Sequence, residues 1–146
     1  MTRAATIRRA IATAIEGATP DSRAHVDDRF RHLDAGSIDP DSAPDRVFTL
    51  TLAAQPQRIE VNNCDTFRVE YTATFFYAAM QAGVEDRIAS DAERIHAKVE
   101  RLFETTPGVM RVDVAPVGLT EASPSAVTSA FSVIVIYKLD AAVITA

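Results

Sequence analysis

The side chains best suited to acid–base or metal chemistry are the three histidines, and their spacing matches no known ligand pattern. His25 and His32 stand seven residues apart within an acidic segment, residues 21–46. A metal or acid–base role stays open for this pair, although two histidines at that spacing are not a recognised ligand set. His96 lies four residues before Glu100, which favours an ordinary surface pair on a helix.

Three aspartates in the same segment, Asp39, Asp41 and Asp45, form a second candidate, because a hard divalent cation needs several carboxylates. However, the Asp39-Pro and Ser-Ala-Pro sequences around them are typical of turns, and no glutamate follows at the spacing of a calcium-binding loop. We therefore interpret residues 35–46 as an exposed loop with turn chemistry, and we expect no metal site here.

The remaining candidates for chemistry are equally weak. Glu60 and Glu70 lie near a predicted hairpin and could form a carboxylate pair, but surface strands often carry two glutamates. Cys64 is the one cysteine, so an intramolecular disulfide and a cysteine-based metal site are excluded. The chain has no glycine-rich phosphate loop, nucleophile elbow or HExxH sequence. The sequence thus leaves catalysis unsupported rather than excluded, and it indicates no cofactor.

The charge balance argues against a protein that grips nucleic acid. The formal net charge is -5, whereas phosphate binding needs concentrated lysine and arginine. DNA that merely passes the protein remains compatible with this balance. No apolar run approaches the roughly eighteen residues that span a bilayer, and Arg8 and Arg9 interrupt the one stretch that resembles a signal peptide.

Two stretches have the periodicity of an amphipathic helix. The first begins after a capping Thr2, ends at Gly17, and buries a stripe that includes Ile7 and Ile11. The second runs from about Glu85 to Phe103, with an apolar stripe at steps of four and three residues: Ile88, Ala92, Ile95, Val99 and Leu102. A short helix or turn is also expected over residues 27–34.

Four stretches alternate as β-strands do: residues 47–53, 66–77, 109–115 and 129–139. Pro56 is expected to end or bend the first of these strands, and Pro116 is expected to close the third. Residues 119–128 are rich in Ser, Thr, Ala and Pro, which favours a long mobile connection. The centre of the last strand, residues 131–137, carries no charge and is apolar on both faces apart from Ser132, so it must lie centrally in the sheet or be covered by a neighbouring subunit.

The element order helix–strand–strand–helix–strand–strand predicts an α+β fold. We expect a two-layer sandwich, in which a four-stranded, mainly antiparallel sheet carries two helices on one face. Residues 1–146 form one domain in this prediction, and the acidic segment 21–46 is a loop within it.

Several parts of the chain together resemble a known family. An amphipathic helix and a polar stretch lead to Arg-Val-Phe-Thr-Leu at residues 46–50, a helix of the type Asp-Arg-Ile-Ala-Ser-Asp-Ala-Glu-Arg-Ile follows at residues 86–95, and the last strand contains Ser-Val-Ile-Val-Ile-Tyr at residues 132–137. This layout is similar to that of the tail terminator, or tail completion, proteins of tailed bacteriophages and of related particles such as gene transfer agents. The resemblance implies a non-enzymatic structural virion protein. Such proteins form hexameric rings that stop polymerisation of the tail tube and join the tail to the head connector.

The resemblance also implies partners and contact surfaces. A ring neighbour would cover the last strand, and the loops 35–46 and 117–128 would contact the tube or the connector, so the candidate interface residues are Phe131, Val133, Val135, Tyr137, Asp39, Asp41, Asp45, Leu119 and Glu121. DNA would pass the lumen without specific binding. The protein would assemble in the host bacterial cytoplasm and reside in the virion neck, without a cofactor or a membrane. Three alternatives stay open: another head–tail neck protein, a small-molecule-binding or enzymatic α+β domain, and a regulatory subunit of a cellular complex.

Overall fold

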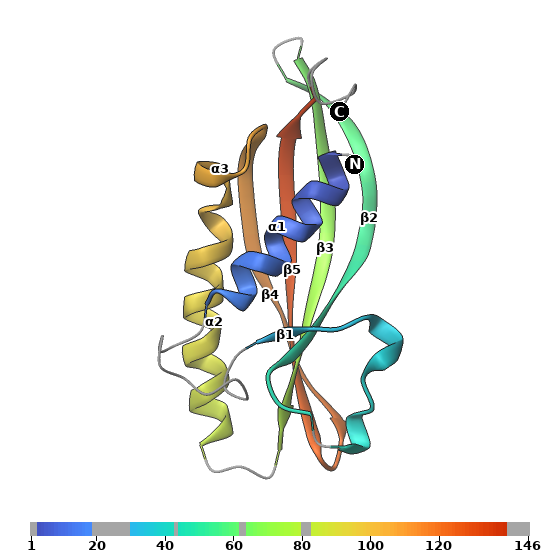
Figure 1. Cartoon of the computed structure of the whole chain (residues 1–146), viewed down its shortest axis with the longest axis vertical. Coiled ribbons are helices and arrows are strands. Elements are labelled where there is room, and N and C mark those ends of the chain that lie inside the picture. The colour runs from blue at the N-terminus through green and yellow to red at the C-terminus, as the bar shows by residue number, and fades with distance from the viewer. Residues whose placement is uncertain (1–2, 19–29, 43, 62–63, 80–82, 140–146) are drawn as a thin grey trace.

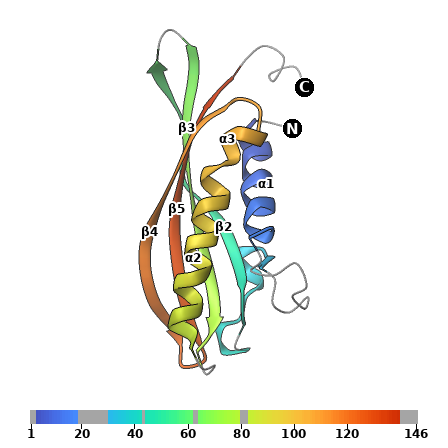
Figure 2. The same cartoon turned by 90° about the vertical axis from the view of Figure 1, so that its left-hand side faces the viewer.

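Two helices cover one face of a β-sheet, so the chain belongs to the α+β class (Figures 1 and 2). This computed structural model describes residues 3–18, 30–42, 44–61, 64–79 and 83–139. Helix α1 (Arg3–Glu16) crosses the sheet obliquely, and α2 (Val84–Glu100) is followed by the short α3 (Leu102–Thr105). Two 3₁₀ turns, η2 (Ala35–Ser37) and η3 (Pro40–Ser42), precede the first long strand.

The described residues form a five-stranded mixed sheet with the order β1-β2-β3-β5-β4. Its strands are β1 (Arg31–His32), β2 (Val47–Val61), β3 (Cys64–Ala78), β4 (Val109–Ser123) and β5 (Ala126–Lys138). The prediction of four strands missed β1, which pairs with β2 in the parallel sense. Strand β1 has only two residues, which is too short for an alternating pattern to show in the sequence. It is held in place by hydrogen bonds from Arg31 N to Arg46 O and from Leu33 N to Phe48 O. The helix or turn expected over residues 27–34 is not helical in its described part, residues 30–34.

The long connection expected over residues 119–128 is wrong, because β4 and β5 run through it and form a hairpin around Pro124 and Ser125. Pro116 does not end β4, and Pro56 does not end β2. Both strands lie towards the outside of the sheet, where a residue without an N–H is tolerated, and both shift register near the proline.

The most apolar strand, β5, lies between β3 and β4 and is paired along both edges. Of the two arrangements that its sequence allowed, the central position is the one observed. Its odd-numbered side chains from Phe131 to Tyr137 point under the helices and are buried within the protomer. The four β5 residues expected to form a subunit interface, Phe131, Val133, Val135 and Tyr137, therefore belong to the core instead.

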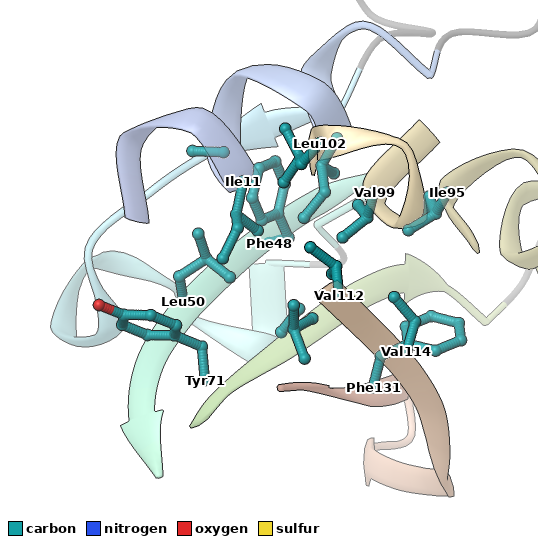
Figure 3. Packing of buried hydrophobic residues seen from close by; sticks show 14 of the residues in the cluster. Ile11, Phe48, Leu50, Tyr71, Ile95, Val99, Leu102, Val112, Val114 and Phe131 are labelled. Atoms are coloured by element: carbon teal, nitrogen blue, oxygen red, sulfur yellow. The ribbon is translucent and has the colours of Figure 1, made fainter. Parts of the chain in front are cut away.

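The helix faces predicted from periodicity are confirmed. Ile7, Ile11 and Ile15 of α1 are buried, and so are Ile88, Ile95 and Val99 of α2. Figure 3 shows Ile11 and Leu102 above Phe48 and Leu50 of β2, with Val112 and Val114 of β4 beside them. Helix α1 ends before Gly17 as expected, whereas its predicted cap Thr2 lies outside the described residues.

Candidate functional site

The most elaborate polar cluster is built around Asp91, which α2 directs at the sheet. Its side chain is fully buried. The carboxylate accepts two hydrogen bonds from Arg46, at 3.0 Å from Nε and 2.9 Å from Nη2, and a third from the Tyr77 hydroxyl at 3.0 Å. Arg94, one helical turn further along α2, donates a fourth. The cluster thus joins the start of β2, the end of β3 and α2.

This cluster is saturated rather than poised for acid–base work. Four donors occupy the two Asp91 oxygens, and burial, together with the Asp91 charge, raises the pKa of Tyr77 far above its ordinary value, so its hydroxyl stays protonated. The guanidinium of Arg46 also lies 5.7 Å from the centre of the Phe30 ring. The arrangement is suited to holding α2 on the sheet. The sequence contained a signal for it, since Asp91 stands within the apolar stripe between Ile88 and Ile95.

The three aspartates predicted to share a loop do not converge. The Asp39 carboxylate accepts a hydrogen bond from the backbone N–H of Asp41 at 3.0 Å, and its carbonyl accepts the Ser42 hydroxyl at 2.7 Å, which confirms the turn chemistry. Asp45 instead pairs with Arg87 of α2 at 2.8 Å and accepts the backbone N–H of Ala78. Within the ranges described, no three His, Cys, Asp or Glu side chains are placed to hold a metal ion.

The other predicted acid–base candidates are also apart. His96 and Glu100 form the expected surface pair, with 2.7 Å between Nε2 and Oε1. The His32 ring stacks on Phe48, with 5.1 Å between ring centres. His25 and the side chain of Cys64 lie outside the described part of the molecule.

The two glutamates near the first hairpin do not form a pair across it. Glu60 lies opposite Asp65, and Glu70 lies opposite Ala54, further down the same pair of strands. The Glu70 carboxylate accepts the Ser132 hydroxyl on the helix-free face of the sheet. This polar contact joins β3 to β5 and is structural.

Large apolar side chains are exposed on both outer long strands. On β4, Val117 and Leu119 are 65% and 62% exposed, and on β2 Leu52 is 52% exposed. Leu119, one of the predicted contact residues, is therefore on the surface. The side chain of Glu121, another of them, lies outside the part of the molecule that the structure describes. In the described part of the chain, the outer edge of β4 pairs with no strand, and β2 has only the short β1 beside its first residues. Arg8 of α1 covers part of the β2 edge by donating to the Leu50 carbonyl at 3.0 Å.

A groove of about 870 Å³ opens between α1 and the α2–α3 segment. Much of its lining, here called the floor, consists of small or apolar side chains, chiefly Ala10, Ala14, Ala97 and Leu102. Four cationic side chains and one carboxylate line it: Arg9, Arg94, Lys98, Arg101 and Glu104. No spacing in the sequence predicts this groove, because its cations come from two helices that only the fold brings together.

Comparisons with known proteins add no assignment. No family model matches the chain, and no curated protein matches it either. None of the helices in the described ranges is long and apolar enough to cross a membrane.

Proposed function

We propose that this chain is a structural subunit of a phage-like particle, and that it forms a ring that caps the tail tube and joins the tail to the head connector. The resemblance of its element order to tail terminator proteins motivates the proposal. The observation that carries it is the exposure of large apolar side chains on the two outer long strands of one sheet: Leu52 on β2, and Val117 with Leu119 on β4.

Two different apolar surfaces at opposite edges of the sheet favour a head-to-tail contact between protomers. A contact of this kind joins one surface of a copy to the other surface of the next, and it closes into a ring when the rotation between copies is right. Open strand edges and contiguous exposed apolar patches are features that soluble monomers generally avoid. A neighbour on each side would cover both.

The long axis of the protomer supplies two distinct ends for two distinct partners. The β2–β3 pair extends beyond the helices at one end, and the β4–β5 turn lies at the other (Figures 1 and 2). In a ring, one end would face the tube and the other the connector. The net charge of -5 suits a lumen through which DNA slides without sticking.

Light scattering over a range of concentrations, with and without tail-tube protein, tests the proposal. We expect a hexamer, or a monomer that becomes a ring on tubes and limits their length. Leu119→Lys and Val117→Lys should prevent the ring, whereas Ala89→Lys on the exposed side of α2 should not. A strict monomer or dimer that ignores tube protein would sink the proposal. A ring that binds connector protein without limiting tube length would place the chain elsewhere in the neck.

A further inference from the structure

The groove between α1 and α2 has a charge opposite to that of the protein as a whole. Four cations and one carboxylate line it in a chain whose net charge is -5. Arg94 forms an ion pair with Asp91, and Arg101 forms one with Glu104, with 3.3 Å between Nε and Oε2. Arg9 and Lys98, in contrast, are exposed and make no ion pair with any residue in the described ranges. An incoming carboxylate would therefore find two available cations above an apolar floor.

A surface of matching chemistry is present on the same chain. Residues 34–42, here called the acidic arm, contain Asp34, Asp39 and Asp41 and no lysine or arginine. All three aspartates are exposed, and Ile38 and Pro40 lie between them. The carboxylates of Asp34 and Asp41 make no hydrogen bond or ion pair with the described residues.

The acidic arm has a fixed shape, which lowers the entropic cost of binding. Its two 3₁₀ turns are closed by Ser37 N to Asp34 O at 2.9 Å and by Ser42 N to Asp39 O at 3.1 Å. The Ser123 hydroxyl, from the β4–β5 hairpin, donates to Pro40 O at 3.1 Å and anchors the arm to the sheet.

The two surfaces lie on opposite sides of the protomer. Figure 1 shows η2 and η3 on the β2 side of the sheet, while α2 and α3, which form one wall of the groove, lie on the β4 side. A contact between arm and groove is therefore a contact between copies, and it has the head-to-tail form that closes a ring.

We propose that the acidic arm of one copy docks in the basic groove of the next copy. This inference rests on the proposed ring and names the contact that sets its register. Charge complementarity of this kind orients the partners and speeds their encounter, and salt weakens it. Side chains such as Ile38 and Pro40 would meet the alanine-rich floor while the carboxylates meet Arg9 and Lys98.

Charge reversal on each side provides the test. One variant combines Arg9→Glu with Lys98→Glu, and the other combines Asp34→Lys with Asp41→Lys. Each should weaken self-association by about tenfold or more, because every contact then joins like charges. Both pairs of side chains are exposed, and circular dichroism and thermal unfolding would verify that each variant folds. Glu85→Lys with Glu93→Lys, exposed on α2, changes the net charge as the arm variant does and should leave association unchanged.

Mixing the two reversed variants is the decisive step. In a ring of alternating copies every contact again joins opposite charges, so the equimolar mixture should regain the mass of the wild-type ring although neither variant does alone. Rings that persist in both variants would overturn the arm–groove contact and leave the proposed function standing. Association that is lost on reversal and regained on mixing, but never closes or engages tube protein, would keep the contact and overturn the function. A wild-type chain that is monomeric throughout would overturn both.

Discussion

Arg46 and Asp91 are 45 residues apart in the chain, yet they meet through two parallel hydrogen bonds in the interior of the protein. Arg46 is also the one non-glycine residue with a positive φ, 52°, among the residues described. A left-handed conformation costs a residue with a side chain about 1–2 kcal/mol. The buried, doubly hydrogen-bonded partner offsets that cost, and it fixes the start of β2 against α2.

Removing the carboxylate should destabilise the fold strongly. Asp91→Ala leaves the buried Arg46 without its partner, and loss of one member of a buried ion pair costs about 3–5 kcal/mol. Urea unfolding followed by circular dichroism would measure this change. Glu93→Ala, two residues along α2 and exposed, should shift the free energy of unfolding by less than about 0.5 kcal/mol. A loss below about 1 kcal/mol for Asp91→Ala would contradict the structural role assigned to this pair.

Alkaline pH should destabilise the protein through its tyrosines. Burial raises the pKa of all three above the ordinary 10.0, most strongly for Tyr77, where the Asp91 charge adds to the effect. Above pH 10 the unfolded chain therefore loses protons that the folded chain keeps. The stability that these groups contribute is fully present below about pH 10 and declines above it, at about 1.4 kcal/mol per pH unit for Tyr77 alone.

Two measurements check this alkaline effect. Urea unfolding between pH 8 and 11 should show the decline, and the tyrosinate absorbance of the native protein should rise at a higher pH than that of the urea-unfolded chain. Tyr77→Phe should reduce the slope of the unfolding free energy against pH by the amount that corresponds to about one proton. A native protein whose tyrosines titrate near their ordinary pKa would contradict the prediction.

Gly108 should tolerate alanine less well than Gly83 does. Both have a positive φ, 86° and 70°, but a Cβ at Gly108 would lie 2.9 Å from the guanidinium carbon of Arg3, whereas nothing lies near one at Gly83. Arg3 also donates a hydrogen bond to the Pro107 carbonyl. Because the Arg3 guanidinium can move away at the cost of its hydrogen bond, we expect a loss of about 1 kcal/mol for Gly83→Ala and about 1.5–2 kcal/mol for Gly108→Ala, measured by thermal unfolding. The extra loss at Gly108, beyond that of Gly83→Ala, should vanish in an Arg3→Ala background, where Gly108→Ala with Arg3→Ala is compared with Arg3→Ala alone.

Two valines of the β4–β5 hairpin should respond differently to truncation. Val133 is buried under the helices, and Val133→Ala should cost about 2 kcal/mol of folding free energy, because two methyl groups leave a packed core. Val117 is exposed, and Val117→Ala should leave the free energy of unfolding within about 0.5 kcal/mol. Equal losses at the two positions would mean that β4 packs more closely than described.

The helices were predictable because their signal is local. Ile88, Ile95 and Val99 repeat at the helical period, and a stripe of that kind has one stable solution, burial against the sheet. The number of long strands could be predicted from the sequence, but the residues at which they begin and end could not. Pro116 stops a central strand and is tolerated at an edge, and nothing near it in the sequence states which edge of which sheet it will occupy.

The candidate surfaces were less predictable, because they are made by the fold. Leu119 was singled out correctly as exposed but within a loop that is in fact a strand. Phe131 and its neighbours were expected at an interface because their two apolar faces had to be covered, and β3, β4 and the helices supply that cover within the protomer. The groove cations Arg9 and Lys98 sit on separate helices, so no spacing in the sequence could connect them.

The central position of β5 has a consequence for how the protein is made. A ribosome delivers β3 well before, and β4 just before, the strand that separates them, so the β3 and β4 edges that β5 will pair stay open until residues 126–138 have emerged. Partial folding of the N-terminal portion gains little stability, because the sheet then lacks β5, which joins β3 to β4. Synthesis thus favours a single late collapse of the whole chain, and a prematurely terminated product would be a target for chaperones and proteases.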